Sequence, residues 1–78
     1  MLKLSFKTSE EPVEILNEAE AFFRDWGLRV REKGSCTLSL EGGGGYVRVD
    51  INDNGVREVT IETREWESPV KEFATKHK

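Results

Sequence analysis

The apolar residues of this chain change their period along the sequence, and that change constrains the fold more than any other feature. Segment 2–7, LKLSFK, alternates apolar and polar side chains, as a strand with one buried face does. The next segment has the helical period, because four of its apolar residues fall on one stripe: Ile15, Ala19, Phe22 and Trp26. Alternation then returns as far as residue 64, and a second helical pattern closes the chain.

Residues that favour helix ends flank the first helical segment. Thr8 or Ser9 is expected to cap its start, and Glu11 stands three residues after Thr8, as in a capping box. Pro12 falls within the first turn, where its missing N–H does no harm. Gly27 is expected to end the helix, because glycine readily adopts the left-handed conformation found just past helix ends.

Further strands are expected between the two helices at residues 28–32, 36–40, 46–51 and 56–64. Each of these alternating stretches is bounded by a short turn. Turns this short imply antiparallel hairpins. The closing helix is expected to have Ser68 as its cap and Pro69 at its first helical position. One face of this helix is apolar and has four members: Val70, Phe73, Ala74 and His77.

The apolar residues of all the expected strands have matching parity, so they can form one continuous sheet face. These residues are Leu2, Leu4, Phe6, Leu28, Val30, Cys36, Leu38, Leu40, Val47, Val49, Ile51, Val59 and Ile61. With both helices packed on that face, the sequence predicts an α+β two-layer sandwich in the order β-α-β-β-β-β-α, with a five-stranded, mostly antiparallel sheet. Residues 1–78 are expected to form a single domain. The first strand fits beside either the second or the fifth.

The composition excludes several classes of protein. No apolar run approaches the roughly 18 residues needed to span a bilayer, and the single Cys36 forms neither an internal disulfide nor a zinc site by itself. We therefore expect a cytoplasmic protein that does not enter membranes. Twelve Glu, three Asn and no Gln resemble the composition of thermophilic proteins, although the labile Asn54-Gly55 pair argues against such an origin.

The segment DINDNG, residues 50–55, matches the start of a calcium-binding loop. The twelfth position of such a loop carries a bidentate Glu, but here it is Ile61, and both flanks alternate as strands do. A tight hairpin turn, which favours Asn, Asp and Gly, is therefore the first interpretation. The alternative is a weak Ca²⁺ site with four oxygen ligands: Asp50, Asn52, Asn54 and Glu58.

Catalysis is not expected, because no residues in the sequence combine a nucleophile, a base and an orienting group. Cys36 is expected on the buried face of a strand, and His77 as a surface imidazole near a frayed end. The run of four glycines, Gly42–Gly45, lacks the Gly-Lys-Ser/Thr ending of a phosphate-binding loop. We expect it to be a mobile hairpin loop.

The residues of opposite parity are expected to form an uncovered, mildly basic sheet face. Segment 9–27, with six acids and one base, is by contrast strongly acidic. Across the uncovered face, Glu58 and Glu62 are expected to form an ion-pair ladder with Arg48 and Arg64.

An apolar patch at the rim of this face is a further expectation. Tyr46, Val56 and Trp66 share the water-facing parity, and the alternative for them is partial burial beneath the second helix. The candidate binding residues of the uncovered face are Arg29, Arg31, Tyr46, Arg48, Arg64 and Trp66.

These patterns predict a small non-catalytic binding domain without a cofactor that acts through its exposed sheet face. A protein partner or self-association is the favoured interpretation. The alternatives are weak Ca²⁺ binding at residues 50–58 and binding of single-stranded nucleic acid on the basic sheet face. The isoelectric point of about 5.2 argues against nucleic acid, because dedicated nucleic-acid domains have a larger basic excess.

Overall fold

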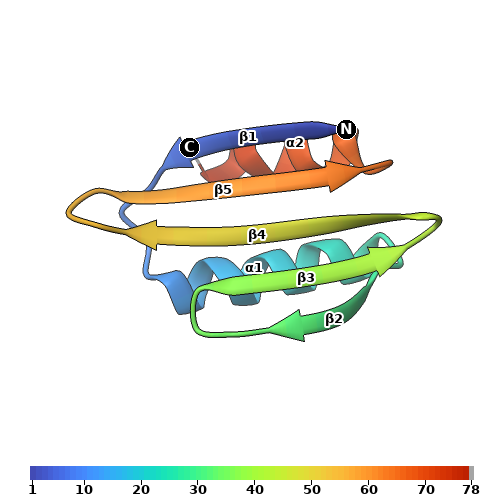
Figure 1. Cartoon of the computed structure of the whole chain (residues 1–78), viewed down its shortest axis with the longest axis horizontal. Helices are drawn as coiled ribbons and strands as arrows, with labels where there is room; N and C mark the ends of the chain where they lie inside the picture. Colours follow the sequence, from blue (N-terminus) through green and yellow to red (C-terminus); the bar gives the residue numbers. More distant parts are fainter. Residues whose placement is uncertain (78) are drawn as a thin grey trace.

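The computed structural model describes residues 1–77, which form one five-stranded sheet and two helices. In chain order the elements are β1 (Leu2–Lys7), α1 (Pro12–Asp25), β2 (Arg29–Lys33), β3 (Thr37–Gly42), β4 (Gly45–Asp53), β5 (Arg57–Arg64) and α2 (Glu67–His77). The strand order is β1-β5-β4-β3-β2, and every neighbouring pair is antiparallel. Figure 1 shows both helices behind the sheet, with α2 behind β1 and β5. The predicted α+β architecture is therefore confirmed, and the first strand lies beside the fifth.

The core lies between the helices and one face of the sheet. The ring centroids of Phe22 and Phe23 of α1 lie 5.5 and 5.6 Å from that of Phe73 of α2, so an aromatic cluster joins the two helices. Phe23 and Phe73 are fully buried, and burial of each contributes about 1.5–3 kcal/mol. Within residues 1–77, neither helix has the length and apolar character needed to cross a membrane.

Two of the expected helix caps are wrong. Helix α1 has Glu11 at its N-cap without a side-chain cap, because Thr8 instead accepts a hydrogen bond from the backbone N–H of Glu10 at 3.1 Å within the β1–α1 connection. Helix α2 begins at Glu67, so Ser68 lies inside its first turn. The expected end of α1 is confirmed, because Gly27 has a φ of 97°.

The second strand departs from strict alternation. A bulge between Val30 and Glu32 shifts the register, so Lys33 turns toward α1 and its Nζ donates to Asn17 and Glu20. Val30 remains on the helix side but is 37% exposed, because β2 is an edge strand.

Cys36 is exposed, which contradicts its expected burial. The third strand begins only at Thr37, and Cys36 belongs to the turn before it. The backbone carbonyl of Cys36 accepts a hydrogen bond from the N–H of Ile51 at 2.8 Å. The residue therefore contributes its backbone, and not its side chain, to the packing of the sheet.

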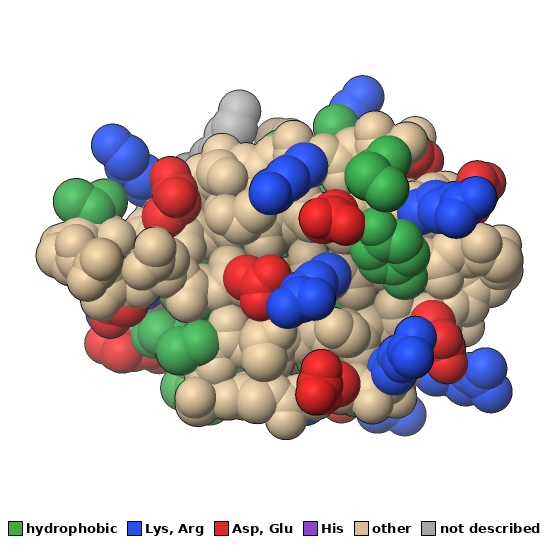
Figure 2. Space-filling model, in the orientation of Figure 1, with side chains coloured by type: hydrophobic (Ala, Val, Ile, Leu, Met, Phe, Trp, Pro, Cys, Tyr) green, Lys and Arg blue, Asp and Glu red, His purple; other side chains and the backbone are tan. Residues whose placement is uncertain are grey.

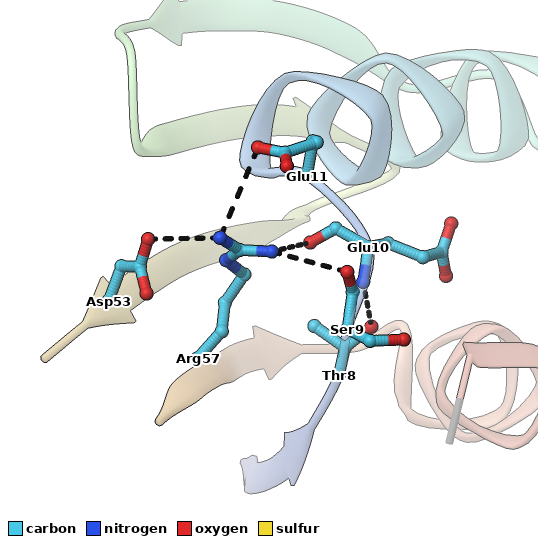
Figure 3. Close-up of polar contacts among 6 residues, drawn as sticks. All are labelled: Thr8, Ser9, Glu10, Glu11, Asp53 and Arg57. Carbon is cyan, nitrogen blue, oxygen red and sulfur yellow. Dashed lines mark hydrogen bonds and ion pairs between the residues drawn. The ribbon is translucent and has the colours of Figure 1, made fainter. Parts of the chain in front are cut away.

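Arg57, at the start of β5, anchors the connection between β1 and α1 (Figure 3). Its guanidinium donates to the carbonyls of Ser9 and Glu10 at 3.2 and 2.7 Å and to Asp53 at 3.1 Å. A carboxylate oxygen of Glu11 lies 4.0 Å away. Arg57 thus holds the loop that carries the chain from the sheet into α1, because one planar fork satisfies two backbone carbonyls and one carboxylate.

Two substitutions on α1 test which of its faces is buried. Ile15 lies in the core, whereas Val13 is 61% exposed. We expect Ile15→Ala to lower the free energy of unfolding by about 2–5 kcal/mol, because it opens a cavity, and Val13→Ala to change it by about 0.5 kcal/mol at most. Urea unfolding followed by circular dichroism measures both. Equal costs for the two variants would contradict this placement of the helix.

Candidate functional site

The sheet face opposite the helices is uncovered and is the candidate site. Figure 2 views the molecule from this side and shows acidic and basic side chains interspersed across the strands. The face is polar because it carries the residues whose parity is opposite to that of the core. The strand register therefore decides which of these polar side chains become neighbours.

The register aligns a row of four residues across β2, β3, β4 and β5 beside the turn between β3 and β4. Arg29 pairs with Glu41, Glu41 with Tyr46, and Tyr46 with Arg64. In the next row Arg48 stands opposite Ser39 and Glu62. Together with Arg31 in the β2 bulge, these basic and aromatic side chains form what we call the arginine face: Arg29, Arg31, Tyr46, Arg48 and Arg64.

Two adjoining hollows make the arginine face concave. One has a volume of about 430 Å³ and is lined by Arg31, Arg48 and Glu62 among others. The second has a volume of about 470 Å³ and is lined by Arg29, Arg64 and the glycines of the β3–β4 turn. Both are also lined by Arg31, Glu41 and Tyr46. The structure thus brings together five of the six candidate binding residues.

The arginines of this face differ in their partners. Arg48 pairs with Asp50 at 3.0 Å, and Arg31 lies 3.7 Å from Glu41. Among residues 1–77, Arg29 and Arg64 have no ion-pair partner within 4.0 Å. Two guanidinium groups in one row are therefore available to an incoming anion.

Tyr46 is held in place between these arginines. Its hydroxyl donates to a carboxylate oxygen of Glu62 at 2.6 Å, and this hydrogen bond, together with burial, raises the pKa of Tyr46. The expected ladder of Arg48 and Arg64 with Glu58 and Glu62 does not form as ion pairs in the described part of the chain. Glu62 accepts from Tyr46, and Arg48 turns along its own strand to Asp50.

The glycine run beside the arginine face has specific packing roles. Only Gly43 and Gly44 form the turn, with φ values of 57° and 82°, while Gly42 and Gly45 are paired strand residues. A Cβ at Gly45 would overlap the backbone carbonyl oxygen of Arg64, and one at Gly43 would lie 2.9 Å from the ring of Trp66. The run is thus a tight hairpin with a two-residue turn, shorter than the expected four-residue loop, and the expected mobility stays a prediction.

Trp66, the sixth candidate binding residue, does not line the hollows. It packs against the core, and its indole N–H donates to the carbonyl of Gly42 at 2.8 Å. Its ring meets that of Trp26, the exposed C-cap of α1, edge to face at 6.5 Å. Val56 lies in the turn at the opposite end of β4, so Tyr46, Val56 and Trp66 do not form one patch. Partial burial is the correct interpretation for Trp66.

The candidate calcium ligands are distributed along the other end of the uncovered face. Asp50 stands opposite Thr60, and Asn52 stands opposite Glu58 in the next row. The two oxygens of Asp50 accept hydrogen bonds from Thr37 at 3.0 Å and Arg48 at 3.0 Å. Asn54 lies in the turn between β4 and β5. The weak Ca²⁺ site stays a prediction, in which an ion would replace Arg48 at Asp50.

A second polar cluster, which the sequence did not reveal, joins α2 to the start of α1. Nδ1 of His77 donates to Glu10 at 2.8 Å, and its Nε2 lies 3.7 Å from a carboxylate oxygen of Glu18. The side chain of His77 is only 9% exposed, and its ring lies on that of Phe73 at 4.3 Å. The expected surface imidazole is therefore wrong. The position of His77 four residues after Phe73 on the apolar face of α2 indicated that its ring is buried, but not which carboxylates it meets.

The ligand atoms of Glu10, Glu18 and His77 lie within 4.8 Å of one another, close enough together to hold a metal ion. Each ring nitrogen of His77 already faces a carboxylate. That arrangement suits an imidazole that ties two segments together, since a metal ion would have to replace one of these carboxylates at the ring. We therefore interpret Glu10, Glu18 and His77 as a structural link between the two helices, and we call this group the clasp.

Comparison with models of known protein families and with curated proteins gave no significant match. The function is therefore argued from the geometry of this chain.

Two glycine substitutions test the packing beside the arginine face. Gly44 has open space around it, so an Ala side chain would meet no neighbour there. Gly44→Ala is expected to lower the free energy of unfolding by about 1–2 kcal/mol, because Ala must adopt the left-handed backbone conformation. Gly45→Ala forces the backbone of β5 to move and is expected to cost about 3 kcal/mol or more. Thermal unfolding measures both. A smaller cost for Gly45→Ala than for Gly44→Ala would refute the close approach of Arg64 to this turn.

The clasp has a pH dependence with opposite signs at its two carboxylates. The hydrogen bond from His77 holds the pKa of Glu10 below its ordinary value of 4.5, so the stability that Glu10 contributes is present above that value and is lost as pH falls. Burial, and then the neighbouring Glu10, raises the pKa of Glu18, so ionisation of Glu18 lowers stability as pH rises through its raised pKa.

We therefore expect Glu10→Gln to destabilise the fold and Glu18→Gln to stabilise it at neutral pH, with both differences shrinking as pH falls toward about 4. Each effect is expected to stay within about 1 kcal/mol, because water screens both carboxylates. Urea unfolding of the two variants and the natural sequence between pH 4 and pH 7 measures these differences. The same sign for both variants at neutral pH would contradict the prediction.

Proposed function

We propose that the protein is a binding domain whose arginine face recognises an acidic segment of a protein partner. The observation that carries this proposal is the row Arg29, Glu41, Tyr46 and Arg64 at the edge of two hollows. Its two outer members are arginines without an ion-pair partner among the described residues. A guanidinium binds a carboxylate through two parallel hydrogen bonds, which gives both affinity and orientation.

Tyr46 supports a protein partner because it supplies a rigid apolar surface between the two arginines. Tyr and Arg are enriched among the residues that contribute most to protein–protein binding. The Tyr46 ring is fixed by its hydrogen bond to Glu62, so little side-chain entropy remains to be lost on binding. The tight Gly43-Gly44 turn beside the row has no side chains that would obstruct a bound segment.

Charge favours an acidic protein segment over a nucleic acid. Glu41 and Glu62 stand between the arginines, and a continuous phosphate backbone would meet these carboxylates. Single-strand binding surfaces combine several aromatic platforms with a basic groove, whereas this row offers Tyr46 alone. A short segment with spaced carboxylates matches the alternation of positive and negative charge better.

Fluorescence anisotropy with labelled Asp/Glu-rich peptides tests the proposal, with single-stranded oligo(dT) as the competing probe. The double variant Arg29→Glu and Arg64→Glu is expected to weaken binding of a selected peptide by about 100-fold or more, because it removes two charge-assisted contacts. The matched control changes the same amount of charge on α2 through Lys71→Glu and Lys76→Glu and is expected to leave binding within about threefold.

Equal losses in the two double variants would show that binding depends on overall charge and not on the arginine face. Binding of oligo(dT) without binding of any acidic peptide would reject a protein partner in favour of nucleic acid. Both results would contradict the proposal.

A further inference from the structure

The two edges of the sheet differ in how they are protected against pairing. Edge strand β2 carries a bulge, and four of its five residues, Arg29 to Lys33, are charged. Bulges and charges are features that natural sheets use to block pairing at an edge. Edge strand β1 pairs with β5 through six consecutive residues without a bulge, contains no proline, and has two charged residues, Lys3 and Lys7, where β2 has four. Figure 1 shows β1 at the upper edge of the sheet with no further strand beyond it. The β1 edge is therefore regular and open.

One hydrogen bond identifies which backbone N–H and C=O groups of β1 face away from β5. The N–H of Thr8 donates to the carbonyl of Arg57 at 3.1 Å, and these residues continue the β1–β5 register. Because hydrogen-bonded and non-hydrogen-bonded pairs alternate in an antiparallel ladder, the even-numbered residues of β1 bond to β5. The backbone N–H and C=O groups of Lys3, Ser5 and Lys7 therefore point outward from the sheet.

The side chains of β1 also separate into two kinds. Leu2 and Leu4 lie on the helix side and are half-buried, while the odd-numbered residues are exposed on the uncovered face. Leu4 lines a shallow groove of about 400 Å³ with Lys71, Ala74 and Thr75 of α2. Part of the apolar surface at this edge is thus accessible, directly beside the outward-pointing backbone groups.

We propose that the β1 edge binds the β1 edge of a second copy of this chain, in antiparallel pairing about a twofold axis at Leu4. Two symmetric registers place the uncovered faces of both copies on the same side of the joined sheet and pair five of the six β1 residues. One register is centred on Leu4 and the other on Ser5. The register centred on Ser5 places Lys3 opposite Lys7 of the second copy twice, and like charges opposite each other are unfavourable. The register centred on Leu4 places Lys3 opposite Ser5.

The helix side of the strand supports the same register. Pairing about Leu4 places Leu4 against its own copy and Leu2 against Phe6 of the second copy, so apolar side chains meet beside the two grooves. The outward backbone groups of Lys3 and Ser5 then bond to each other across the axis. The strand is complementary to itself in side-chain type, charge and backbone direction, which favours a second copy over an unrelated strand.

The resulting sheet has ten strands and no overlap between the new interface and the arginine face, since β1 carries none of the arginine-face residues. The inference therefore does not rest on the proposed function. An interface formed by one strand and a shallow groove is small, so we expect a dissociation constant in the micromolar range.

Substitutions at Ser5 test both the dimer and its register. In the proposed register residue 5 faces Lys3 of the other copy in two symmetric places. Ser5→Glu is therefore expected to lower the dissociation constant roughly threefold to tenfold and Ser5→Lys to raise it by a similar factor. Sedimentation equilibrium at low salt measures both. A monomer at millimolar concentration overturns the proposal, as does a change in the same direction in both variants, which the register centred on Ser5 would give.

A disulfide test reports the position of the axis directly. In a Cys36→Ser background, Leu4→Cys is expected to form a covalent dimer under mild oxidation, because the Cα atoms of such a non-hydrogen-bonded pair lie about 4.5 Å apart. The matched control is Val30→Cys on the β2 edge, which leaves the β1 interface intact but is expected to form no covalent dimer. Circular dichroism verifies that both variants fold. Equal cross-linking of the two variants, or none in a folded Leu4→Cys variant, overturns the proposal.

Discussion

The fold depends on the burial of a single face of the sheet. Two helices are available to a chain of this size, and both pack on the same side of five strands. Phe23 of α1 and Phe73 of α2 lie between the layers, where Ile61 and Val49 of the central strands are also fully buried. The four strands other than the bulged edge strand β2 must then alternate, because a shift of one residue would expose their apolar side chains and bury their polar ones. The polar face is the necessary counterpart of that alternation.

The arginine face follows from the same register. Alternation determines that Arg29, Tyr46 and Arg64 face the solvent, but the pairing of four strands makes them neighbours in one row. The Gly43-Gly44 turn contributes as well, because a two-residue turn with positive φ brings Glu41 directly opposite Tyr46. The site is thus an outcome of strand pairing, and no local motif encodes it.

Strand and helix order could be predicted from the sequence because it depends on periodicity, which is a local property. The errors occur where one contact overrides that periodicity. The bulge before Glu32 turns Lys33 toward α1, and a positive φ of 78° at Glu65 precedes Trp66, which packs on the core and not on the uncovered face. The bonding of His77 to Glu10 joins residues 67 positions apart. Such contacts between distant segments leave no trace in a periodic pattern, so the clasp could be found only in three dimensions.

The uncovered face and the open edge have a common cause but require different partners. Helix α2 lies behind β1 and β5, which covers the core there and leaves the outer backbone of β1 free. Pairing of two copies about Leu4 would place both arginine faces on the same side of one continuous sheet. A partner with two acidic segments would then bind the dimer with a high effective concentration at the second site, whereas a partner with one segment would not. Affinity for the first kind of partner should therefore rise with the concentration of this protein, and affinity for the second kind should not.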